Sequence, residues 1–156
     1  MTDRRWKYVF SDAGYAAKHF TRAIEVYSRP APASDEEDYI SSMGFMHMMQ
    51  SGHTSAEAAL RRVLGIVNEE LPIGPDTHAR LIDQCAEPIS GTRPAMVSSE
   101  LRDALRETRR FRHVAMHGYD LLDRGKARHA VEAAKVVASR LEPEIAAFRD
   151  AIDPPG

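Results

Sequence analysis

The chain has 156 residues, of which 43% are hydrophobic and 28% charged, so we expect one globular domain over residues 1–156. Its net charge of −2 argues against a protein that coats nucleic acid non-specifically, but does not exclude a local basic groove. Cys85 is the only cysteine, which excludes an intramolecular disulfide and a cysteine-based zinc site. No apolar stretch approaches the roughly 18 residues of a membrane span, so we expect a cytoplasmic protein without a membrane partner.

The first half of the chain predicts three helices. A first helix spans about residues 11–28 and is stopped by the proline-rich segment RPAPA, because proline lacks a donor and crowds the preceding turn. Ser34–Glu37 (SDEE) and Thr54–Glu57 (TSAE) both have the capping-box pattern that starts a helix. These boxes predict a second helix that ends near residues 51–52 and a separate third helix.

The second half predicts the remaining helices. Asp76 can cap a short helix that reaches Ala86, and Ser98 or Ser99 starts the next one. A last helix over about residues 126–152 contains Pro143, which should kink it or split it in two. Residues 153–156 form a tail that we expect to be disordered. Helices joined by short loops, with no strand pattern, predict an all-α, up-and-down bundle of about five to six helices.

Residues 111–120, FRHVAMHGYD, contain the most informative pattern of the chain. On a helical wheel Arg112 and Tyr119 lie on the apolar side of their helix, and His113 and His117 lie on the other side. An arginine on an apolar face is informative, because arginine is rarely buried without a partner. Arg112 and His117 can converge only through a helix distortion or through a second subunit.

The motif R-x4-H-x-Y, late in a helical chain, resembles the HEPN superfamily and within it the HepT-like toxins. The resemblance implies a metal-independent ribonuclease without a cofactor, with Arg112 and His117 as catalytic residues. It also implies a homodimer or a higher even oligomer, and a cognate antitoxin of the MntA-like nucleotidyltransferase type that transfers AMP to Tyr119. The family often has asparagine after the arginine, whereas this chain has His113, whose role stays open.

The residue types fit this chemistry. A histidine titrates near neutral pH and can move a proton at the ribose 2′-OH or at the leaving 5′-oxygen. The Arg112 guanidinium can stabilise charge that develops on the phosphate. Arg109 and Arg110, together with His113, are candidates for binding the RNA substrate.

Two other interpretations of this segment remain open. His113 and His117 form an H-x3-H pair with metal-ligand spacing, although no third ligand follows from the sequence. The chain could instead be a non-catalytic helical module that binds a nucleotide or a partner protein in the same groove. His47, His53 and His78 have no recognisable partners in the sequence, and we expect them at the surface.

Overall fold

The computed structural model describes residues 3–116 and 123–154, without the side chains of residues 114–116. The described part of the chain contains five helices and no strand. These helices are α1 (Trp6–Tyr27), α2 (Asp35–Ile66), α3 (Thr77–Ala86), α4 (Ser99–Met116) and α5 (Arg124–Ile152). The all-α fold predicted from the sequence is therefore confirmed.

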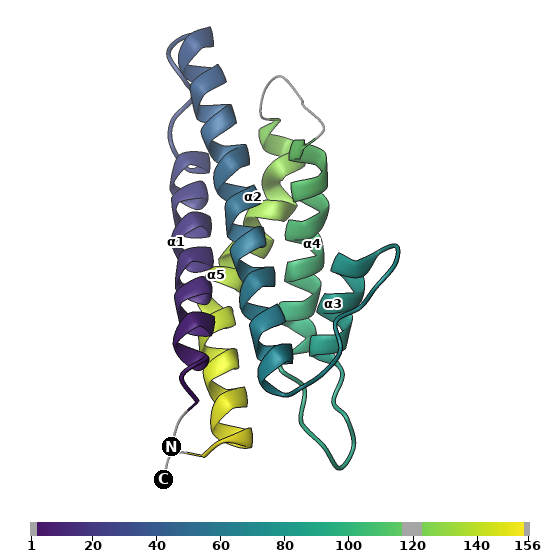
Figure 1. Ribbon diagram of the computed structural model, residues 1–156. Coiled ribbons are helices and arrows are strands. Elements are labelled where there is room, and N and C mark those ends of the chain that lie inside the picture. The colour runs from purple at the N-terminus through teal and green to yellow at the C-terminus, as the bar shows by residue number, and fades with distance from the viewer. Residues whose placement is uncertain (1–2, 117–122, 155–156) are drawn as a thin grey trace.

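Four of these helices form an antiparallel bundle (Figure 1). Helix α1 packs against α2 and α5, and α4 packs against the same two helices. The four long helices thus close a ring around one core, with successive helices running in opposite directions. The short helix α3 lies outside this ring and packs on α2 and α4.

Helix α1 begins earlier than the sequence pattern predicted. Trp6 and Val9 are buried and continue the apolar stripe that runs through Ala13, Ala16 and Phe20. Burial of the Trp6 side chain stabilises the additional helical turn, since each large apolar side chain removed from water contributes about 1.5–3 kcal/mol to the stability of the fold.

The predicted second and third helices are one continuous helix, so the predicted break at residues 51–52 is wrong. Phe45, Met49, Ala56 and Leu60 are all fully or nearly fully buried, and their spacing follows one helical face across the expected break. A glycine inside a helix costs about 1 kcal/mol, which is small beside the burial of this stripe. Gly52 is also where α2 approaches the Phe20 ring of α1: an added Cβ would lie 2.8 Å from it.

Two further expectations about helix ends differ from the structure. Asp76 precedes α3 in the left-handed region, with φ of 59°, and its side chain makes no capping hydrogen bond. Helix α5 continues through Pro143 as one helix, so the predicted split does not occur. Leu141 and Ile145 flank the proline and are buried, so core packing holds both sides of the helix in place despite the lost hydrogen bond.

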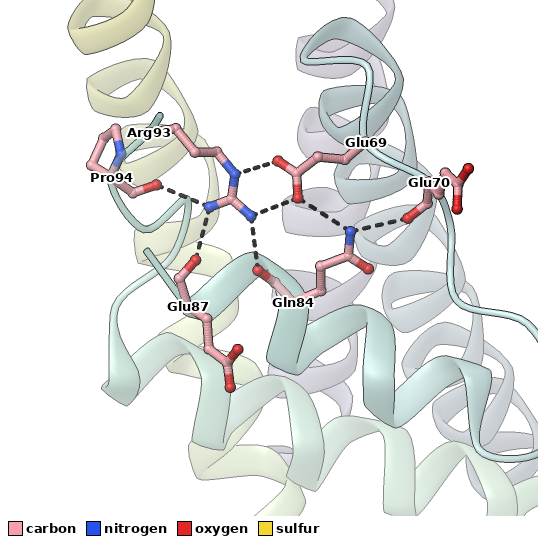
Figure 2. Close-up of polar contacts among 6 residues, drawn as sticks. All are labelled: Glu69, Glu70, Gln84, Glu87, Arg93 and Pro94. Carbon is pink, nitrogen blue, oxygen red and sulfur yellow. Dashed lines mark hydrogen bonds and ion pairs between the residues drawn. The ribbon is translucent and has the colours of Figure 1, made fainter. Parts of the chain in front are cut away.

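Arg93 fixes the long segment between α3 and α4 (Figure 2). Its guanidinium forms an ion pair with Glu69 and donates to the backbone carbonyl oxygens of Gln84, Glu87 and Pro94 over 2.9–3.1 Å. The residue is only 7% exposed, so these bonds replace the water that the charge has lost. Ser98 ends this segment and caps α4, because its hydroxyl oxygen accepts from the Leu101 N–H over 3.1 Å.

Candidate functional site

Arg112 lies in the last part of α4, where this helix faces α2. Its Nε atom donates a hydrogen bond to Oγ1 of Thr54 over 3.2 Å. The preceding residue, Phe111, packs edge-on against Phe45 of α2, with ring centroids 5.6 Å apart. Arg112 is partly buried and Thr54 is exposed, so the guanidinium lies at the edge of the α2–α4 contact, within reach of a ligand.

A buried polar network lies next to Arg112, formed by His53, Glu57, His78 and Thr108. The two ring nitrogens of His53 contact Glu57 Oε1 and Thr108 Oγ1, each over 2.8 Å. The second carboxylate oxygen of Glu57 contacts Nδ1 of His78 over 2.6 Å. His53 is fully buried, and the network joins α2 to both α3 and α4. We call it the polar network below.

The protonation states of the polar network follow from its hydrogen bonds. Burial alone would raise the pKa of Glu57, but hydrogen bonds from His53 and His78 lower it to about 2, so Glu57 is a carboxylate at neutral pH. Burial lowers the pKa of His53, and the positive charge of Arg112 lowers it further, although Glu57 opposes this. His53 is therefore neutral at neutral pH.

A neutral His53 beside a carboxylate has one possible tautomer. A carboxylate can only accept, so the single ring proton of His53 is on Nε2 and is donated to Glu57. Nδ1 of His53 and the carbonyl oxygen of Leu105 are then both acceptors for the single Thr108 hydroxyl proton, over 2.8 and 3.1 Å. By the same reasoning His78 donates its Nδ1 proton to Glu57.

The predicted RNA-binding residues occupy the outer side of α4. Arg110 is exposed and pairs with Glu107 over 2.9 Å, and Arg106 pairs with Asp83 of α3. Among the residues that the structure describes, Arg109 has no ion-pair partner. His113 is exposed. Acidic neighbours thus offset the positive charges of Arg106 and Arg110. The charge of Arg109 is not offset by an ion pair among the described residues.

The other two motif residues, His117 and Tyr119, lie outside the described residues. The structure therefore does not test their predicted roles, nor the metal interpretation of the His113–His117 pair. Within residues 3–116 and 123–154, no group of three or more His, Cys, Asp or Glu is arranged to hold a metal ion.

The expectation that His53 is a surface residue is wrong, and so is the expectation that His53 and His78 have no partners. His47 is exposed, as expected. His53 is buried and His78 is hydrogen-bonded to Glu57, although its side chain is 41% exposed. Glu57 does not cap a helix, because Thr54 lies inside α2. The sequence does contain a pattern that indicates their burial. If one helix continues past Gly52, His53 and Glu57 are four residues apart on its apolar stripe.

Cys85 does not contribute to a reactive site. The thiol is fully buried, and burial raises its pKa to about 12. A thiol with so high a pKa is a poor nucleophile at neutral pH, because the thiolate is the reactive form. Its small side chain belongs to the core.

Comparison with known proteins places these features in a family. In the described part of the chain, no helix combines the length and apolar character needed to cross a membrane. Searches of curated proteins and of solved structures gave no match. A family described as "HepT-like protein" matches residues 44–152, which include α2 from Gly44 onward, the polar network and the complete R-x4-H-x-Y motif. The chain therefore belongs to the HepT-like family of the HEPN superfamily.

Proposed function

We propose that this protein is a metal-independent endoribonuclease that acts as the toxin of a toxin–antitoxin pair. The observation that carries the proposal is the position of Arg112. Its guanidinium lies at the accessible edge of the α2–α4 contact, held by one exposed hydrogen bond to Thr54, inside the segment that matches the HepT-like family. The two Nη groups can bind a phosphate while Nε keeps its bond to Thr54, and guanidinium–phosphate hydrogen bonds are strong because both partners are charged.

The proposed reaction transfers the ribose 2′-oxygen to the neighbouring phosphorus. A base removes the 2′-OH proton, the 2′-oxygen attacks, and the P–O5′ bond breaks. The leaving 5′-oxygen takes a proton, which gives a 2′,3′-cyclic phosphate and a 5′-hydroxyl end. Arg112 stabilises the charge on the phosphate, and His117 transfers one of the protons. Arg109, Arg110 and His113 help to bind the RNA.

Two copies of the chain complete the site in this proposal. The spacing of the motif separates Arg112 from His117 around a regular helix, so Arg112 of one copy would act with His117 of its partner. An antitoxin of the nucleotidyltransferase type would transfer AMP to the Tyr119 hydroxyl. The added phosphate would compete for the positive charge of Arg112 and block access to it.

The test compares RNA cleavage by the parent protein, Arg112→Ala and His117→Ala in buffer that contains EDTA. We expect the parent to produce 2′,3′-cyclic phosphate ends and both variants to lose cleavage while keeping the helical circular-dichroism spectrum. Arg62→Ala is a matched control, because Arg62 is on α2 but pairs with Asp12 of α1. Full activity of both motif variants would contradict the catalytic assignment. A parent that cleaves no RNA but binds a nucleotide or protein tightly would favour the non-catalytic module.

Mass spectrometry tests the modification separately. After co-expression with a nucleotidyltransferase encoded beside the gene, we expect Tyr119 to carry one AMP and cleavage to stop. Tyr119→Phe should stay unmodified and active under the same conditions. An unmodified Tyr119 in the co-expressed protein would remove the AMP-transfer part of the proposal and leave the ribonuclease part standing.

A further inference from the structure

His78 is the one member of the polar network whose side chain reaches solvent to a large extent. Its side chain is 41% exposed, whereas that of Glu57 is 8% exposed and that of His53 fully buried. Its Nδ1 proton is donated to Glu57, so in the neutral ring the Nε2 atom has a free lone pair. Among the described residues, Nε2 of His78 has no hydrogen-bond partner.

Glu57 gives His78 the properties of a positioned base. A carboxylate that accepts the Nδ1 proton fixes the tautomer and the orientation of the ring, and it stabilises the imidazolium that forms when Nε2 takes up a proton. Glu57 is itself fixed, because its other oxygen accepts from the buried His53. His53 is in turn fixed by Thr108. A surface histidine without a role does not require this chain of buried partners.

His78 and Arg112 contact the same turn of α2. Arg112 contacts Thr54 and His78 contacts Glu57, and residues three apart on a helix have Cβ atoms about 5–6 Å apart. Arg112 is also close enough to His53 for its charge to lower the pKa of that residue. A phosphate bound by Arg112 therefore has the adjoining ribose within reach of the exposed edge of His78.

We infer that His78, oriented by Glu57, is a second proton-transfer residue of the Arg112 site and that its Nε2 atom takes the proton from the ribose 2′-OH. The 2′-oxygen then attacks phosphorus, the P–O5′ bond breaks, and the leaving 5′-oxygen takes a proton, as in the proposed reaction. His78 returns to its starting state when it releases its proton to water. Glu57 and His53 are positioning residues. This inference rests on the proposed ribonuclease function.

The ionisable groups around this base are few and come from three helices. Glu57 and His53 face it from α2, and Arg112 of α4 interacts with His53. Asp76, just before α3, and Arg80 of α3 are its neighbours in sequence, and Arg80 donates to the carbonyl oxygen of Ile73. Glu57 is the carboxylate that contacts the Nδ1 atom of His78, over 2.6 Å.

The test measures single-turnover cleavage of one single-stranded RNA against pH in EDTA, with the parent, His78→Ala and His78→Gln. We expect both variants to cleave about 100-fold more slowly, with RNA affinity nearly unchanged and without the rise in rate that accompanies deprotonation of the base. Added imidazole should restore part of the activity of His78→Ala, because the position is open to solvent. Glutamine can still donate to Glu57, so His78→Gln separates proton transfer from support of the fold.

His47→Ala is the control. His47 is an exposed histidine of the same helix as Glu57 and hydrogen-bonds Ser51; this variant should cleave like the parent, and imidazole should not change its rate. The inference is wrong if the parent cleaves RNA and His78→Gln matches its rate and pH profile, or if imidazole fails to rescue a folded His78→Ala. A parent that cleaves no RNA overturns the proposed function itself, and with it the role of His78.

Discussion

Arg112 of α4 donates from Nε to the hydroxyl oxygen of Thr54 in the middle of α2, across 3.2 Å and 58 positions of sequence. This bond joins the one motif arginine that the structure describes to the turn of α2 that carries the polar network. The bond occupies only Nε, so the two Nη groups of Arg112 can bind a ligand while it persists. It also gives the guanidinium a defined position before a ligand arrives.

Replacing the Thr54 hydroxyl should reduce activity without unfolding the protein. Thr54→Val keeps the shape of the side chain but removes the acceptor, and one net hydrogen bond corresponds to about 0.5–1.5 kcal/mol. We therefore expect kcat/KM for RNA to fall by about two- to thirteenfold. Thr54→Ser keeps a hydroxyl and should retain most of the activity. Equal kinetics for the valine variant and the parent would show that this bond does not prepare Arg112.

The free energy of unfolding should fall as the solution becomes acidic. Glu57 has a pKa of about 2 in the folded protein and about 4.5 in the unfolded chain. Its stabilising contribution is therefore complete above pH 4.5 and is lost as the pH falls toward 2. This shift corresponds to about 3 kcal/mol. His53 acts in the same direction from about pH 6.5 downward, because its folded pKa is also lowered. Urea denaturation at a series of pH values measures both parts.

The matched variant for this measurement is Glu57→Gln, which cannot titrate. We expect it to be less stable than the parent at pH 7, because His53 loses a charged partner in the core. Below pH 4.5 its free energy of unfolding should depend less on pH than that of the parent. Parallel curves for the two proteins in this range would show that Glu57 does not carry the acid sensitivity.

Adding a methyl group at Gly52 should separate α1 from α2. The new Cβ would lie 2.8 Å from the buried Phe20 ring, and overpacking of this kind costs about 1–3 kcal/mol. Gly14 of α1 has nothing within 4 Å of the corresponding position. Gly14→Ala should therefore stabilise the protein by about 0.5–1 kcal/mol through helix propensity. Thermal unfolding of both variants checks the pair, and a Gly52→Ala protein as stable as the parent would contradict the close packing.

Local sequence patterns predicted the helical character of the chain, most of its helix ends and the family. Apolar spacing and capping residues act over about four positions, so they are recognisable among neighbouring residues. The R-x4-H-x-Y motif is also local; it predicted the family, and with it Arg112 as a candidate site residue. The prediction was wrong at residues 51–57. A glycine and a capping-box sequence there indicated a break between two helices, but burial of this segment against α1 keeps α2 continuous.

The contacts between polar residues of different helices follow from the closed bundle and not from local patterns. Thr108 and His78 are 55 and 21 positions from the α2 residues that they contact, and no local pattern encodes such pairs. Burial of His53 and Glu57 is tolerated because His78 of α3 and Thr108 of α4 form hydrogen bonds with them. Those partners are in place only once the bundle has closed. The same closure brings Arg112 and His78 to one turn of α2, which is why the second histidine of the site could not be found from the sequence.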